Sequence, residues 1–125
     1  MTAFIEAAAR DVTAADANVV SFPAWAEMML YEAGLRSARV VVQAAGYRVA
    51  ADRGHVTAIE AADALTNGAH HRILVRLNRM RRVSHGFMYE TARDPSTQDL
   101  AQARRDVERL IVIARRTVDR LEKGR

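Results

Sequence analysis

The sequence has 125 residues, the usual size of one domain; half of them are hydrophobic, but only 6% are aromatic. Much of the hydrophobic fraction is alanine, which favours closely packed helices over a β-sandwich. The absence of cysteine excludes disulfides, thiolate zinc sites and a thiol nucleophile, and the arginine excess behind the net charge of +4 favours partners that carry phosphate or carboxylate.

The N-terminal part of the chain predicts two helices. A short amphipathic helix is expected from about Thr2 to Val12, within a segment that ends near residue 20. Ser21 can cap the next helix, and Pro23 is tolerated in its first turn, where a missing N–H costs nothing. This helix is expected to be long and to end at Gly46, because apolar residues recur at steps of three and four: Met28, Tyr31, Leu35, Ala38, Val42 and Ala45.

Three more helices are predicted after residues 47–55, which are expected to form a loop or a frayed helix end. A short helix that includes Val56 and Leu65 is expected to stop at Gly68, and a helix over His70–Glu90 follows. Ser96 and Asp99 form a capping-box pattern at the start of the last helix. The apolar stripe of that helix is Leu100, Ala103, Val107, Leu110, Ala114, Val118 and Leu121. We therefore predict an all-α, up-and-down bundle of four to five helices that forms one domain over residues 1–125.

Membrane and metal sites are disfavoured by the sequence. No run approaches the roughly 18 apolar residues of a membrane span, so we expect a cytoplasmic protein with no membrane segment. His70 and His71 are adjacent, so their side chains should diverge, and no histidine–carboxylate pattern repeats the spacing of a metal site. We expect neither a metal nor a cofactor.

The segment His70–Glu90 combines apolar periodicity, positive charge, histidine and tyrosine. At about 100° per residue, one face is apolar and should be buried; it comprises Ile73, Leu74, Leu77, Met80, Ser84, Phe87 and Met88. On the opposite face long cationic side chains should stay hydrated; these are Arg72, Arg76, Arg79 and Arg82. Between the two faces lies the candidate site, which we name the Asn78–Tyr89 edge; it consists of Asn78, Arg81, His85 and Tyr89.

This edge suits phosphodiester chemistry. Histidine, with an unperturbed pKa of about 6.5, can take or give a proton near neutral pH. Arg81, one helical turn before His85, can hold a phosphate oxygen. The alternative is structural: His85 and Tyr89 would then be boundary residues bonded to neighbouring helices, and the arginines would only form a solvated face.

Several short motifs, taken in order, resemble the HEPN superfamily, in particular its small stand-alone prokaryotic members. They are Gly46-Tyr47-Arg48, the segment from Gly54 to Ala61, and the arginine-rich segment from Leu77 to Arg82 that leads to Tyr89-Glu90. The resemblance implies a bundle of four to five helices that forms a two-fold dimer, often a toxin paired with a nucleotidyltransferase antitoxin. Active members of the family are metal-independent endoribonucleases.

The family's catalytic signature is an arginine, a polar residue and then a histidine. In one register Arg79 pairs with His85, although Met80 stands at the polar position. In the other register Ser84 and His85 stand where the family has its arginine and polar residue, and Tyr89 stands at the histidine. In both registers Arg81 or Arg82 could serve the site from a neighbouring turn.

The resemblance implies a toxin-like endoribonuclease, and two groups of residues would form its site. The catalytic group is Arg81, Arg82, His85 and Tyr89. The group that binds RNA is Asn78, Arg79, Arg76 and Ser84. A homodimer is expected in which two Asn78–Tyr89 edges face each other and double the local arginine density. The alternative, favoured by the incomplete signature, is a non-catalytic HEPN module that binds a partner protein, a nucleotide or RNA without cutting it.

Overall fold

The computed structural model describes residues 1–48, 54–89 and 94–124, with their side chains except at 54–56 and 82–89. Within these ranges every regular element is a helix, so the predicted all-α class is confirmed. None of the described helices is long and apolar enough to cross a membrane. The helices are α1 (Thr2–Asn18), α2 (Pro23–Ala44), α3 (Gly54–Leu65), α4 (His71–Tyr89) and α5 (Thr97–Lys123).

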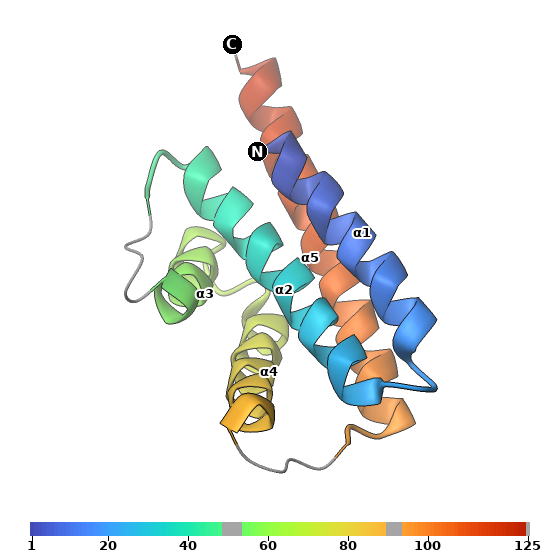
Figure 1. Ribbon diagram of the computed structural model, residues 1–125. Coiled ribbons are helices and arrows are strands. Elements are labelled where there is room, and N and C mark those ends of the chain that lie inside the picture. Colours follow the sequence, from blue (N-terminus) through green and yellow to red (C-terminus); the bar gives the residue numbers. More distant parts are fainter. Residues whose placement is uncertain (49–53, 90–93, 125) are drawn as a thin grey trace.

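Helix α2 lies at the centre of the bundle (Figure 1). It contacts each of the other four described helices: α1 and α5, which also contact each other, and α3 and α4, which form a second pair. The buried residues of α2 form a wide face rather than one narrow stripe, and among them are Leu30, Tyr31, Leu35, Val40 and Val42. The opposite face of α2 carries the exposed residues Glu32 and Gln43. The bundle is therefore built around α2 rather than around the arginine-rich α4.

Helix α1 is longer than the sequence predicts, because it continues past Val12 to Asn18. The added turns contain three alanines, which are strong helix formers. One of them, Ala15, extends the buried stripe that begins with Ile5 and Ala8. Packing against the core therefore stabilises the helix over residues 13–18, although the Asp and Asn residues of this segment favour a turn.

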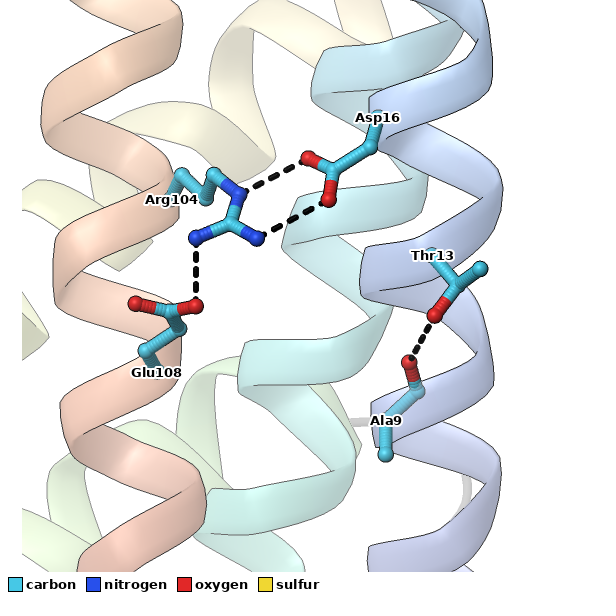
Figure 2. A network of polar contacts seen from close by, with 5 residues as sticks. All are labelled: Ala9, Thr13, Asp16, Arg104 and Glu108. Carbon is cyan, nitrogen blue, oxygen red and sulfur yellow. Dashed lines mark hydrogen bonds and ion pairs between the residues drawn. The ribbon is translucent and has the colours of Figure 1, made fainter.

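A polar network joins α1 to α5, as Figure 2 shows. Arg104 donates two hydrogen bonds to the carboxylate of Asp16, at 2.7 and 2.9 Å, and one to Glu108 on its own helix. The hydrogen bond from Arg104 lowers the pKa of Asp16. The three side chains are 41–50% exposed, so water screens the network and its net contribution to stability is small. It links two helices whose bonded residues are 88 positions apart in the chain.

The start of α2 differs from the prediction. Phe22, not Ser21, occupies the N-cap position, and no side chain caps the helix. Because Pro23 at the first helical position has no N–H, one fewer donor needs a partner there. The predicted stop is confirmed, since α2 ends at Ala44 and Gly46 has a φ of 91°.

The other predicted helix ends are mostly confirmed. Both hydrogen bonds of the capping box at Ser96 and Asp99 are present, at 3.0 and 3.3 Å. Gly68, after α3, has a φ of 72°. Gly54 and His55, expected in a loop or a frayed helix end, instead form the first residues of α3. Glycine is well tolerated at a helix start, so its presence does not exclude them from the helix.

Glu27 is a buried carboxylate in α2, only 8% exposed. Burial, assisted by the nearby Asp99 carboxylate, raises the pKa of Glu27 above its ordinary value of 4.5. The charged form is therefore less favourable in the folded chain than in the unfolded chain. The resulting loss of stability is absent while Glu27 is protonated, grows as the pH rises from 4.5, and is complete above the raised pKa.

We expect Glu27→Gln to raise the free energy of unfolding at pH 7.5 by about 1 kcal/mol, the usual size of a single stabilising substitution. Urea unfolding at pH 7.5 and pH 4 measures the effect, and the gain should shrink at pH 4, where the wild-type carboxyl is protonated. Glu32→Gln is the matched control, because Glu32 is exposed on the same helix. A gain of equal size at both pH values would contradict this account.

Candidate functional site

The apolar face of α4 contributes to the core, as predicted. Leu74 and Leu77 are each 2% exposed and Met80 is 8% exposed. A Cβ atom built on Gly34 of α2 would stand 2.6 Å from Leu77 Cδ1, so the two helices approach closely there. The side chains of the remaining predicted apolar positions at 84, 87 and 88 lie outside the described residues. Because this face is buried, a ligand can reach α4 only from its other sides.

Arg76 is not the solvated residue that the sequence predicts. Its Nε and Nη2 donate hydrogen bonds of 2.7 and 2.9 Å to the carboxylate of Asp106 on α5. Asp106 is 5% exposed and accepts a third bond, of 2.9 Å, from Gln102. The predicted exposure of this face holds for Arg72 and Arg79. It holds only in part for Arg76, whose side chain is 38% exposed but is bound to the buried carboxylate of Asp106.

Asn78 and Arg81 form the described part of the Asn78–Tyr89 edge. Arg81 Nε donates a hydrogen bond of 3.2 Å to Asn78 Oδ1, and both side chains are half-buried. Burial, together with the charge of Glu32, raises the pKa of Tyr31 on α2 to about 12. Arg81 lies near enough to act in the opposite direction on this phenol. Tyr31 thus remains protonated near neutral pH, and no negative charge on it offsets Arg81.

The charge of Arg81 is not neutralised by the described residues. Arg36, Arg76 and Arg104 each form an ion pair with an aspartate, whereas no described carboxylate lies within ion-pair distance of Arg81. Its guanidinium is held through Nε by a neutral amide, which leaves four N–H donors for another acceptor. An anion that reaches this edge would therefore meet an oriented positive charge.

Four predicted site residues have side chains outside the described part of the structure: Arg82, Ser84, His85 and Tyr89. The backbone of α4 continues through all four. Position 85 is therefore one helical turn beyond position 81, and position 89 is one turn beyond that. The roles predicted for these residues rest on that register.

His70 and His71 have different surroundings, as predicted for adjacent residues. His71 Nδ1 lies 2.6 Å from Asp63 Oδ2 of α3, whereas His70 lines a cleft. Within residues 1–48, 57–81 and 94–124, no three His, Cys, Asp or Glu side chains are grouped so that they could hold a metal ion.

A second basic surface is not predicted from the sequence. A cleft of about 430 Å³, which we name the α5 cleft, lies between the end of α2, the turn before α4 and the second half of α5. Its lining includes His70 and three arginines of α5, which we name the cleft arginines: Arg109, Arg116 and Arg120. The described residues that line it include no carboxylate. On the sequence these arginines resemble the ordinary solvated face of an amphipathic helix.

No family model, curated protein or solved structure matches this chain. Its function is therefore argued from its own residues and geometry.

Proposed function

We propose that this chain is a HEPN-type, metal-independent endoribonuclease and that the Asn78–Tyr89 edge is its cleavage site. The observation that supports the proposal is the pair formed by Asn78 and Arg81. A guanidinium oriented by a neutral amide keeps its full charge for a phosphate group. One turn further along α4 stands His85, a residue type that exchanges protons near neutral pH.

In the proposed reaction His85 takes the proton of a ribose 2′-hydroxyl, and the 2′ oxygen attacks the adjacent phosphorus. The bond between phosphorus and the 5′ oxygen breaks, and this oxygen leaves with a proton from solvent. The products are a 2′,3′-cyclic phosphate and a 5′-hydroxyl. Arg81, with Arg82 beside it in sequence, stabilises the charge on the non-bridging oxygens, and Tyr89 positions the scissile group.

The residues proposed to bind RNA have unequal support. Asn78 orients Arg81, and Arg79 is exposed on the neighbouring face. Two donors of Arg76 are already bonded to Asp106, which leaves it poorly suited to bind RNA. Ser84 is placed only by the register of α4.

The proposed active form is a two-fold homodimer in which two Asn78–Tyr89 edges face each other. An isologous contact of this kind duplicates Arg81 and His85 in one groove and raises the positive charge that a single RNA strand meets. Light scattering that finds only monomer at micromolar concentration would exclude the arrangement.

We expect His85→Ala to abolish cleavage of total RNA in the presence of EDTA, because the base that accepts the 2′ proton is lost. His71→Ala is the matched control, since it removes the same side chain from an exposed position at the start of the same helix. The control should cut RNA at the wild-type rate. Gel analysis measures cleavage, and end-group mapping identifies the cyclic phosphate.

Both variants should keep the wild-type helix content by circular dichroism. Equal cleavage by the wild type and His85→Ala would contradict the proposed site. Equal loss in both histidine variants would indicate that the effect does not belong to this edge.

A second candidate is a non-catalytic HEPN module that binds RNA, a nucleotide or a partner protein. The burial of Met80 favours it, because the register that pairs Arg79 with His85 needs a polar residue at this position. Arg79 itself is exposed on a different face from the Asn78–Tyr89 edge. Binding of RNA by the wild type without any cleavage would support this candidate, as would co-purification with a nucleotidyltransferase and no ribonuclease activity.

A further inference from the structure

The three cleft arginines converge on one concave surface without acidic neighbours in its described lining. None of them forms an ion pair with a described carboxylate, although Arg36, Arg76 and Arg104 do so elsewhere in the bundle. A run of arginines on a helix is usually a solvated face, but these three line a concave surface. Three unpaired guanidinium groups around one cleft form a concentrated positive site.

The stability of α5 does not account for this cluster. Arg116 and Arg120 are four residues apart, so their like charges repel across one turn of the helix. Arg120 lies in the last turn, where a cation is favoured by the helix dipole. That benefit does not extend to Arg109 and Arg116, because the dipole effect fades within the last turn. A bound anion would remove the repulsion.

Further groups around the cleft suit an anionic ligand. Helix α4 begins at His71, beside the cleft residue His70, so the positive end of its dipole lies at the cleft. Burial and the charge of Arg109 lower the pKa of His70, which therefore stays neutral near pH 7 and can donate one N–H bond. The ligand would thus meet hydrogen-bond donors from both α5 and the turn before α4.

The size and the apolar part of the cleft narrow the class of ligand. A volume of about 430 Å³ is in the range that small-molecule ligands occupy. Val41, Leu65 and Ile113 line the same cleft, so a ligand can also bury an apolar body there. Free inorganic phosphate would make no apolar contact with these side chains.

We propose that the α5 cleft is a binding site for a small phosphate ester, whose phosphate contacts Arg109 and Arg116 and whose apolar body contacts Ile113. Guanidinium groups match phosphate oxygens with two parallel hydrogen bonds, and a phosphate dianion neutralises more of the cluster than a carboxylate does. The site does not depend on the proposed ribonuclease activity. Arg81 lies ten residues along α4 from its first residue, His71, a rise of roughly 15 Å, so this site and the Asn78–Tyr89 edge are separate.

Calorimetric titration of the full chain with phenyl phosphate tests the proposal. We expect saturable binding, tighter than that of inorganic phosphate at the same pH and ionic strength. The double variant Arg109→Gln with Arg116→Gln should weaken binding of phenyl phosphate by roughly 100-fold, since each lost bond between charged groups removes about one power of ten. The matched control is Arg10→Gln with Arg72→Gln, which changes the net charge equally at exposed positions of α1 and α4 outside both proposed sites.

The control should bind phenyl phosphate within about twofold of the wild type, the small change expected from screened, distant charges. Thermal unfolding establishes that both double variants are folded, which is expected because the replaced side chains are exposed. Three outcomes would overturn the proposal: no saturable binding by the wild type, equal weakening in the two double variants, or inorganic phosphate binding as tightly as phenyl phosphate.

Discussion

Arg76→Met is expected to lower the free energy of unfolding by about 3 kcal/mol, one of the largest effects of any single substitution in this chain. The change leaves the carboxylate of Asp106, only 5% exposed, with Gln102 as its remaining side-chain donor. Removing one partner of a buried ion pair typically costs about 3 to 5 kcal/mol. We place the cost at the low end because the Arg76 side chain is 38% exposed and its charge is partly screened. Urea unfolding at pH 7 measures it.

Two further variants test the physical cause. Arg79→Met changes an exposed arginine one turn away and should alter stability by less than about 0.5 kcal/mol. Combining Arg76→Met with Asp106→Leu should recover most of the loss, because a buried ion pair can often be replaced by apolar residues without cost. A loss that the second substitution does not reduce would show that Arg76 acts through its packing rather than through its charge.

Gly34→Val is expected to lower the free energy of unfolding by about 2 to 3 kcal/mol, the usual cost of adding atoms to a packed core. A Cβ at this position would stand 2.6 Å from Leu77 Cδ1 and 3.5 Å from Val107 Cγ2. Leu77 is itself almost fully buried and cannot swing into solvent. Gly34→Ala should cost less, because alanine adds one atom and favours the helix. Thermal and urea unfolding of both variants provide the comparison.

The complementary variant is Leu77→Ala, which alone should cost about 3 kcal/mol by leaving a cavity. In the double variant, Gly34→Val with Leu77→Ala, the added valine occupies part of that cavity. The combined loss should therefore be smaller than the sum of the two single losses by at least about 1 kcal/mol, since residues in contact couple. Simple additivity would show that Gly34 and Leu77 do not form the close approach between α2 and α4.

The helices were largely predictable from the sequence, because each signal is local. Apolar periodicity, the Ser96–Asp99 capping box, Gly46 and Gly68 act within a few residues of the chain. The central position of α2 was not predictable from one apolar stripe. Residues such as Leu30 and Val40 form a second buried face, and the helices that cover it are set by tertiary packing.

The candidate site was only partly predictable, and Arg76 shows why. Helical geometry places it with Arg72 and Arg79, and that geometry is retained. Its partner stands thirty residues away on another helix. One signal was present: Asp106 lies between Ala103 and Leu110 on the apolar side of α5, and an acidic residue at a buried position predicts a cationic partner. Periodicity alone does not identify which cation.

The α5 cleft was not predictable from the sequence for a related reason. Arg109, Arg116 and Arg120 follow the helical repeat and look like a solvated face. They line a concave surface only because the end of α2 and the turn at His70 form the other walls. A concave surface made by three separate segments has no signature in any one of them.

The central α2 also determines when the core can close during translation. Helices α1 and α2 can pair early, but their shared neighbour α5 arrives much later: the bond between Arg104 and Asp16 spans 88 positions of the chain. At about 5 to 20 residues per second, the delay is on the order of ten seconds. During this delay, the side of the nascent α1–α2 hairpin that α5 will later cover is exposed to solvent. The newly made chain therefore exposes apolar side chains on this surface, although the finished bundle buries them.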